Sequence, residues 1–434
     1  MTKSFKDPGL PVPNPSLSFW LQEARSSSLL GHRTTEEFPH TTDVVIIGAG
    51  ISGVATAYFL LAGTRPPRSI VILEAREVCY GATGRNAGYC RLDCYAGYPG
   101  YKAKFGREQA FKILQNEMDT LNLLTELVEK ESIECDFWKG HAFDIAISEE
   151  GAELLKAAYH ECKADGGNID GVVELILDPG EAKIESTIVI LIRLIKQATA
   201  SAHPHPLCIQ KCIDNYGLNL QTSTPVNSVI RAQTEDGWIV RTARGEISTK
   251  QVVYATNAWT AHLLPEYLGA IIPTRIQIVP TRNYSGSQML LSSSAWVDSK
   301  EKIDYIAQRP KDGIIIVGGR RWLIPREHTV DQADDGVKLD VHTGYLKEIL
   351  PAYLEHWGPE APGEGMLCDW TGIAVVPFIG DLPDRPGAYI CAGHVGHGMA
   401  RILSCVQGLA EVMVGARWEE SKIPECFRPT RDRL

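Results

Sequence analysis

The sequence predicts an α/β protein of two domains, and three observations support this fold class. The largely apolar segment Asp43–Ile47 leads through a glycine-rich turn into a helical segment, Ile51–Leu61, the order expected of a buried parallel strand and its crossover helix. A second such strand, Ser69–Glu74, completes a β-α-β unit of about 35 residues. Strand-like segments dominate the later chain, and a last strand, Tyr389–Ala392, precedes a helix over about 399–414.

Between these ends the pattern predicts a second, mixed domain. Apolar residues recur at helical spacing over 105–130, and a charged helix is expected over 149–164. Strands are expected at 226–231, 238–242, 252–255, 275–280, 305–310 and 313–319. We therefore expect a nucleotide-binding domain assembled from separated pieces (41–104, 205–264 and 361–434), an α+β substrate domain with a mixed or antiparallel sheet (105–204 and 265–360), and an amino-terminal arm (1–40).

Composition excludes several functional classes. The chain has 434 residues, 44% hydrophobic and 22% charged, which is typical of a globular protein with a sizeable core. Its 43 Lys and Arg against 53 Asp and Glu give a net charge of -10, so a nucleic-acid or anionic membrane partner is disfavoured. We expect a small-molecule ligand.

The cysteines and apolar segments indicate where the chain resides. Its eleven cysteines lack CxxC pairs, which favours a reducing compartment and predicts the cytoplasm rather than secretion. The longest aliphatic segment, Thr187–Ile195, is too short to span a bilayer. His394 and His397 lie across a glycine-rich turn with no acid nearby, a poor ligand arrangement, so we predict no metal site.

The clearest motif is a phosphate-binding fingerprint. Gly48-Ala49-Gly50-Ile51-Ser52-Gly53 follows a strand and opens a helix, as in Rossmann-type domains. Gly48 would make the tight turn, Gly50 would admit a pyrophosphate, and Gly53 would let helix and strand pack closely. Glu74, at the end of the second strand, would bind ribose hydroxyls, which disfavours NADP and leaves NAD and FAD as alternatives.

A family resemblance selects between these cofactors. Glu74 is followed by Gly81-Ala82-Thr83-Gly84-Arg85-Asn86-Ala87-Gly88, and this loop resembles the D-amino-acid oxidase superfamily of flavoenzymes, particularly its sarcosine oxidase and γ-glutamylputrescine oxidase branches. Further segments are similar in the same order: 224–226, 253–258, 273–277 and 393–400. The resemblance covers about residues 40–415 and is weakest at 172–206. It implies a glutathione-reductase-like domain that binds FAD.

The expected FAD-binding residues come from four segments. They are Gly48, Gly50, Ile51, Ser52 and Gly53; Glu74, Ala75, Arg76, Gly81, Ala82, Thr83, Arg85, Asn86, Ala87 and Gly88; Val226, Ala255, Thr256, Asn257 and Trp259; and Gly393, His394, Gly396, His397, Gly398 and Met399. The last segment precedes a helix whose free N–H groups would face the flavin edge that becomes negative on reduction.

The implied activity is oxidation of a C–N bond of a small amine, amino-acid-like or imine substrate, with O2 as acceptor and H2O2 as product. An apolar, aromatic pocket would favour the neutral amine, and Tyr89, Tyr305, Trp322 and Trp370 are candidates for it, with core packing as the alternative. Arg85, Arg275, Arg320 and Arg321 are candidates for holding a substrate carboxylate, with surface or cofactor contacts as the alternative. His397 is the polar group that the resemblance places beside the flavin.

Two further features bear on the chemistry. Cys368-Asp369-Trp370-Thr371 is similar to the segment in which some relatives carry a cysteine bonded to the flavin 8α-methyl, so a covalent link at Cys368 is one expectation and buried packing the other. The strand over 313–318 has no lysine, where sarcosine oxidases use one to accelerate reaction with oxygen. The acceptor that reoxidises the flavin therefore stays open. The alternative functions are a dehydrogenase, an oxidative cyclisation enzyme, and a non-catalytic FAD- or NAD-binding protein.

Overall fold

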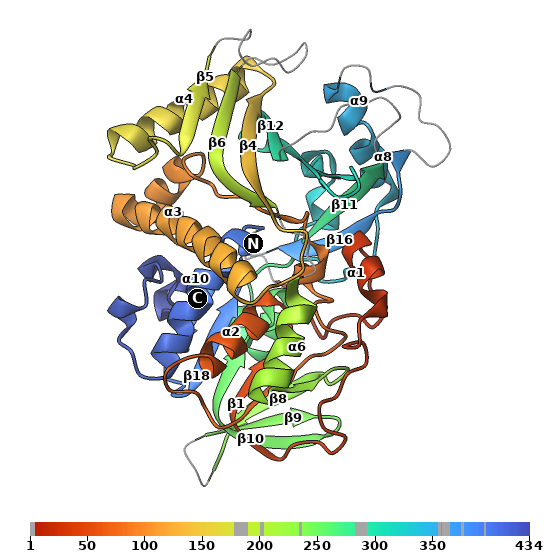
Figure 1. The fold of residues 1–434 in the computed structure, drawn as a ribbon, viewed down its shortest axis with the longest axis vertical. Helices are drawn as coiled ribbons and strands as arrows, with labels where there is room; N and C mark the ends of the chain where they lie inside the picture. Colours follow the sequence, from red (N-terminus) through yellow and green to blue (C-terminus); the bar gives the residue numbers. More distant parts are fainter. Residues whose placement is uncertain are drawn as a thin grey trace.

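The computed structural model describes residues 5–177, 190–199, 204–233, 237–282, 293–354, 357, 365–374, 377–394 and 396–434. Two sheets, each with helices packed on it, lie one above the other in the view of Figure 1. Strands of each sheet come from segments far apart in the chain, so both domains are discontinuous. This arrangement confirms the predicted fold class.

The first sheet is the lower one in Figure 1 and has a parallel centre. Its strand order is β17 (Phe378–Asp381), β18 (Ala388–Ala392), β10 (Gly245–Tyr254), β1 (Thr41–Ile47), β2 (Ile70–Leu73) and β7 (Asn219–Gln221). The strands from β18 to β7 run parallel, while β17 is antiparallel to β18. β8 (Val226–Arg231) and β9 (Trp238–Thr242) extend the sheet beyond β10 as antiparallel neighbours. The central strands are buried on both faces, by helices on one and by β8, β9 and the segment 258–271 on the other, which explains their continuous apolar sequence.

Four helices pack together beside this sheet. α2 (Ile51–Leu61) contacts α10 (Gly398–Met413) and α6 (Pro204–Tyr216), and α10 contacts α3 (Tyr98–Lys130). α2 is buried around nearly its whole circumference, so its small and apolar residues meet protein on every side. The amino-terminal ends of α2 and α10 therefore stand next to each other at one edge of the sheet.

The second sheet is mostly antiparallel. Its order is β15 (Gly365–Met366), β11 (Thr274–Arg282), β14 (Ile315–Gly318), β13 (Lys302–Gln308), β12 (Ser293–Ser299), β4 (Trp138–Ala146), β6 (Ile190–Thr199) and β3 (Tyr89–Cys90), with β16 (Trp370–Ala374) paired to β11 and β5 (Val173–Ile176) to β6. α4 (Glu149–Ala164) packs on β4 and β12, and α8 (Asp340–Lys347), followed by α9 (Ile349–Tyr353), packs near β11. Only the β4–β12 contact among the described pairs of this sheet is parallel.

Most predicted elements are present, with three differences. α3 begins at Tyr98, seven residues before the apolar periodicity. Its first turns form a short helix that the non-helical residue Gly106 (φ 81°) separates from the rest of α3. The aliphatic segment 187–195 lies in the edge region of the second sheet as β6 from Ile190 onward, and residues 187–189 lie outside the described part. β3 and both β15 and β16 pair within the second sheet, although the segments proposed for the nucleotide-binding domain include them.

The amino-terminal arm is tied to the body of the protein. α1 (Phe19–Glu23) is capped by Ser18, whose hydroxyl accepts the N–H of Leu21. Trp20 is 2% exposed and donates from Nε1 to the carbonyl of Asn86 at 2.8 Å. A Cβ added at Gly88 would lie 2.5 Å from the Trp20 ring. Trp20 thus anchors the arm to the loop that contains Asn86 and Gly88. Within the described chain, no helix combines the length and the apolar character that crossing a membrane requires.

Candidate active site

One large cavity lies between the two sheets. Its volume is about 1900 Å³, well above the roughly 300–1,000 Å³ of ordinary small-molecule pockets, so it has room for a dinucleotide and a second molecule. The carboxyl ends of β1 and β10 open into it through Ile47 and Ala255. This is the edge at which parallel α/β sheets bind ligands.

The glycines of the fingerprint are required by close contacts. Gly48 has φ 110°, and a Cβ there would lie 2.6 Å from the carbonyl oxygen of Ala255. A Cβ at Gly53 would lie 2.0 Å from the carbonyl oxygen of Gly48, so this position lets α2 approach β1. At Gly50 a Cβ would meet Thr83 Oγ1 at 3.0 Å, on the cavity wall. Gly48 and Gly53 thus shape the turn, while Gly50 keeps the wall of the cavity open.

Glu74 stands at the carboxyl end of β2, on the cavity wall. Its Oε2 accepts the N–H of Ala49 at 2.8 Å, and its Oε1 accepts the N–H of Arg76 at 2.9 Å. Burial raises the pKa of this carboxyl above its ordinary value, while the two N–H donors lower it. Each oxygen keeps a lone pair for a further donor, as binding of two ribose hydroxyls requires.

The loop after Glu74 is held by its own hydrogen bonds. Thr83, in the 3-10 helix η2 (Ala82–Arg85), accepts the N–H of Ile51 at 2.8 Å, which joins the loop to the start of α2. Asn86 donates to the carbonyl of Thr83 and accepts the N–H of Gly88, both at 2.7 Å. A flexible connector would lack such bonds. The loop is therefore a preformed wall of the cavity.

The carboxy-terminal motif closes the opposite wall. The N–H of Gly393 donates to Asn257 Oδ1 at 3.0 Å, and His397 is the residue directly before α10. Burial, with the positive charge of Arg401 as a second cause, lowers the pKa of both His394 and His397 to about 3. Both imidazoles are therefore neutral at pH 7 and offer hydrogen bonds rather than charge.

Polar groups left unsatisfied in the cavity wall fit FAD. Among the described side chains, Arg76 Nε, Arg85 Nη2, Trp259 Nε1 and His394 Nδ1 are buried without a hydrogen-bond partner, and all four residues line the cavity. Three of these atoms can only donate. Buried donors need acceptors, and FAD brings phosphate, ribityl and pyrimidine oxygens.

Comparison with known proteins identifies the family to which this chain belongs. The family model described as FAD dependent oxidoreductase matches residues 43–411. This chain belongs to that family. Among the curated relatives of this oxidoreductase, a probable oxidoreductase (OrdL) of Haemophilus influenzae is 24% identical, with 95% of this chain and 94% of the relative covered.

Two further proteins of known name are similar. The γ-glutamylputrescine oxidoreductase of Escherichia coli is 24% identical, covering 86% of this chain and 84% of its own length. The solved structure of glycine oxidase from Geobacillus kaustophilus superposes with a TM-score of 0.68 at 21% identity, over 90% of this chain and 99% of that one. The latter likeness shows the shared fold. The protein is therefore an enzyme, an FAD-dependent oxidoreductase.

Most of the residues expected to bind FAD line the cavity. They are Gly48, Gly50, Ile51, Ser52, Glu74, Ala75, Arg76, Gly81, Ala82, Thr83, Arg85, Asn86, Ala87, Val226, Ala255, Thr256, Asn257, Trp259, His394, Gly396, His397, Gly398 and Met399. Gly53, Gly88 and Gly393 lie just behind the wall, in close backbone or ring packing. Direct contact of each residue with FAD stays a prediction.

Three of the candidate residues, Trp370, Arg275 and Cys368, lie behind the cavity wall rather than on it. Trp370 is fully buried in a small core with Trp20, and its Nε1 donates to the carbonyl of Arg85, so it packs behind the cofactor loop. Arg275 is 5% exposed, and its guanidinium donates to the carbonyls of His328 and Asp334, which leaves it no part in holding a substrate carboxylate. Neither residue lines the cavity.

Cys368 is the third. It packs beside the same small core, away from the cavity lining, and Gln22 Nε2 lies 3.5 Å from its Sγ. Burial raises the pKa of its thiol, which makes the thiolate scarce. The expected covalent link to the flavin is therefore not supported by this position. The side chain of Tyr89 lies outside the described part of the chain.

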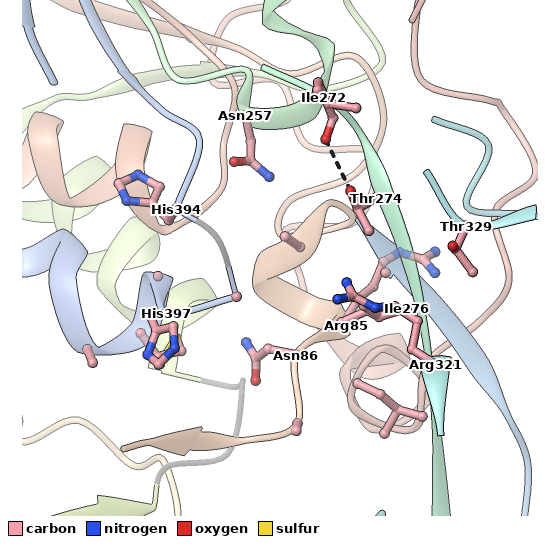
Figure 2. A pocket seen from close by; sticks show the side chains of 18 of the residues that line it. Arg85, Asn86, Asn257, Ile272, Thr274, Ile276, Arg321, Thr329, His394 and His397 are labelled. Atoms are coloured by element: carbon pink, nitrogen blue, oxygen red, sulfur yellow. Dashed lines mark hydrogen bonds between the residues drawn. The ribbon is translucent and has the colours of Figure 1, made fainter. Parts of the chain in front are cut away.

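The remaining wall faces the substrate domain. Tyr305 lies opposite Gly318 in the β13–β14 pair, and its ring lies across that glycine, where a Cβ would come within 2.2 Å. Trp322 and Ile276 complete an apolar and aromatic surface. In the view of Figure 2, His394 and His397 lie on one side of the cavity and Arg85 and Arg321 on the other.

Arg321 differs from the other candidate arginines. Arg320 has φ 53° and is held by Asp304, which accepts its main-chain N–H and its Nε at 3.0 Å each. That turn places Arg321, the first residue of η5 (Arg321–Leu323), on the cavity wall. Within the described residues its guanidinium has no hydrogen-bond or ion-pair partner. Of the four candidate arginines, it is thus the one best placed to bind an anionic group.

Sequence reasoning missed two contributions. Residues Gly9–Pro11 of the arm line the cavity near Arg76 and Trp259. Asp335, from a loop that precedes α8, is fully buried against Arg76 and Arg85. No local sequence signal marks Asp335, because it lies in an acidic, glycine-containing segment that is typical of a surface loop.

Proposed function

We propose that this oxidoreductase oxidises a C–N bond of a small amine or amino-acid-like substrate and passes the electrons to O2, giving H2O2. The observation that carries the proposal is the continuity of the cavity, which joins the FAD cradle to the surface formed by Tyr305, Trp322 and Arg321. A substrate on that surface would lie against the ring end of a bound flavin.

The residues of this surface suit an amine. A free alkyl amine has a pKa of about 10 and must lose its proton before oxidation. The aromatic and aliphatic side chains of Tyr305, Trp322 and Ile276 disfavour the charged ammonium and exclude water. FAD, when bound, supplies the acceptor for the hydride that leaves the carbon next to nitrogen. Arg321 would orient the molecule by its carboxylate.

His397 has a separate part in the proposal. As a neutral imidazole directly before α10, it would offer one donor or acceptor next to the flavin. It holds hydrogen bonds without adding charge. Replacement by alanine is expected to slow flavin reduction by substrate without preventing FAD binding.

The relatives support the same class of donor. The curated names of two similar proteins, γ-glutamylputrescine oxidoreductase and glycine oxidase, both denote compounds with an amine group. The sequence similarity to each of these two proteins extends over most of the length of this chain. The finer substrate is a matter for experiment.

A second candidate function differs in the electron acceptor. β14 (Ile315–Gly318) carries no lysine, so a dehydrogenase or an oxidative cyclisation enzyme with the same hydride chemistry is the second candidate. A cytoplasmic location stays a prediction from the cysteine spacing.

The decisive experiment follows flavin bleaching and peroxide release together. The purified holoenzyme is mixed anaerobically with N-methyl amino acids, D- and L-amino acids, polyamines and cyclic imines, and the flavin absorbance is recorded. Oxygen is then admitted and peroxide is measured. Bleaching by an amine followed by peroxide supports the oxidase. Bleaching with slow reoxidation favours the dehydrogenase, and no bleaching by any amine contradicts the proposed donor.

A further inference from the structure

A buried ion cluster ties the two domains together behind the cofactor loop. Asp335 has no exposed side-chain surface, and its two carboxylate oxygens accept Arg76 Nη1 and Nη2 at 2.9 and 3.0 Å. Arg85 Nε lies 3.4 Å from Asp335 Oδ2. Arg76 and Arg85 stand near the two ends of the loop over residues 75–88, so one carboxylate from the other domain holds both ends.

The second set of contacts of each arginine fixes the loop further. Arg76 donates to the carbonyls of Val12 and Tyr80 at 3.2 and 3.0 Å, and its guanidinium lies 5.3 Å from the centre of the Trp259 ring. Arg85 donates from Nε to the carbonyl of Tyr80 at 2.8 Å. Both arginines therefore converge on Tyr80, in the middle of the loop.

Arg85 also joins the loop to the arm and to the second sheet. Its Nη1 donates to Ser16 Oγ at 3.1 Å and to the carbonyl of Thr371 at 2.9 Å. The main-chain carbonyl of Asp335 accepts the N–H and the hydroxyl of Ser16 at 3.0 and 2.8 Å. The arm thus bonds to the Asp335 backbone, while the partners of the carboxylate among the described residues are the two arginines.

The charge of this cluster indicates what it faces. Two guanidinium groups share one carboxylate by direct contact, which is a surplus of one positive charge among these three groups. The buried carboxyl of Glu74 also interacts with the charge of Arg76, but its oxygens accept main-chain N–H groups. Arg76 Nε and Arg85 Nη2 have no partner in the described chain, and both residues line the cavity. Buried donors without partners are costly unless an acceptor lies near them, and FAD carries a diphosphate.

We propose that Asp335 is a positioning residue for the cofactor. It holds Arg76 and Arg85 so that the loop over residues 75–88 keeps the shape that binds FAD, and tight binding therefore depends on a carboxylate of the substrate domain. Without this charge the two guanidinium groups repel each other and the loop loses its fixed form. The inference rests on the placement of FAD in the proposed function, but not on the substrate.

The test measures the dissociation constant of FAD for the apoprotein by flavin fluorescence. Asp335→Asn keeps the shape and the main-chain contacts to Ser16 while removing the charge. Asp334→Asn is the matched control: it removes one charge at the next residue, where Oδ1 accepts the N–H of Gly336 at 2.8 Å, and the carbonyl that holds Arg275 is unchanged. We expect Asp335→Asn to raise the dissociation constant by at least about tenfold, since one partner of a buried pair is lost, and Asp334→Asn to leave it within about twofold, as is usual for substitutions away from such pairs.

A double-mutant cycle separates positioning from general destabilisation. Asp335→Asn is combined with Arg76→Met, which restores the wild-type surplus of one positive charge. If Asp335 acts through Arg76, its replacement has a much smaller effect on FAD affinity in the Arg76→Met background. Should Asp335→Asn fail to fold, the comparison of the double variant with Arg76→Met still gives this answer, because nearly equal dissociation constants support the inference.

Three results would overturn the inference that Asp335 positions the cofactor loop. They are an unchanged dissociation constant of FAD in Asp335→Asn, an equal loss of FAD affinity in Asp334→Asn, and fully additive effects in the double-mutant cycle. A wild-type apoprotein that takes up no FAD would instead remove the cofactor placement, and with it the proposed function. Normal FAD binding without any amine oxidation would contradict the proposed function and leave the role of Asp335 intact.

Discussion

The side chain of Asn257 accepts the main-chain N–H of Gly393 at 3.0 Å, joining two cofactor segments that are 136 residues apart. Asn257 itself has φ 44°, a left-handed conformation that asparagine tolerates better than most residues. One residue thus combines a turn and a cross-link, and it places the end of β10 against the turn before α10.

Replacing Asn257 separates these two contributions. Asn257→Ala loses both the acceptor and the tolerance of positive φ, so we expect it to lower the free energy of unfolding by about 2–3 kcal/mol and to weaken FAD binding. Asn257→Gly keeps the conformation without the acceptor, and Asn257→Asp keeps the acceptor. Chemical denaturation and FAD titration of the three variants check this. Equal behaviour of the Ala and Asp variants would show that the hydrogen bond has no part.

Two glycines of the fingerprint should differ in their effects. Gly50→Val puts a branched side chain on the cavity wall near Thr83, so the protein is expected to fold while its FAD content falls. Gly53→Ala puts a methyl group 2.0 Å from the carbonyl oxygen of Gly48, which forces α2 away from β1 and lowers stability by about 1–3 kcal/mol or more. Thermal unfolding of the apoproteins and flavin absorbance of the purified proteins distinguish the two. A Gly50→Val protein with full FAD content would contradict our placement of the pyrophosphate.

Arg321 should control substrate binding when the substrate carries a carboxylate. Arg321→Met removes charge-assisted hydrogen bonds of about 1.5–3 kcal/mol, which corresponds to a rise in KM of about 10- to 100-fold. The decarboxylated analogue of the same substrate should show little change. Arg321→Lys keeps the charge without the planar fork and is expected to lie between the two. Equal losses for both compounds would assign Arg321 a role unrelated to the carboxylate.

The neutral His394 predicts how stability depends on pH. Burial lowers its pKa from 6.5 to about 3, so between these values the unfolded chain binds a proton that the folded chain does not. The contribution of His394 to stability is complete above pH 6.5 and falls by up to about 1.4 kcal/mol for each pH unit below it.

The measurement compares unfolding free energies of the wild type and His394→Gln from pH 7.5 to 5. The wild type should lose more stability on acidification than the variant does. Glu117 acts in the opposite direction, since burial raises its pKa to about 7, but it is present in both proteins and cancels in the difference. His141→Gln, at an exposed position of β4, serves as control and should keep the wild-type slope. Parallel curves for His394→Gln and the wild type would refute the prediction.

The amino-acid sequence by itself determined the cofactor half of this site. The glycine turn and Glu74 are local patterns whose residue types are required by backbone approach and by a helix terminus, so their spacing was sufficient to place them on one cavity wall. The loop to Gly88 was assigned to the cofactor by resemblance. The carboxy-terminal motif and the Asn257 turn were recognised by resemblance, and the structure brings both to the same wall.

Only the tertiary structure decided which distant side chains serve the site. Three residues have suitable chemistry but pack behind the cavity wall: Arg275, Trp370 and Cys368. Asp304 binds Arg320, while the guanidinium of the neighbouring Arg321 has no partner among the described residues. Asp335 reaches Arg76 and Arg85 because the loop before α8 folds under residues 75–88. Such roles depend on contacts between segments from 16 to 285 residues apart, and the burial and pairing that create them leave no periodic or local signal in the sequence.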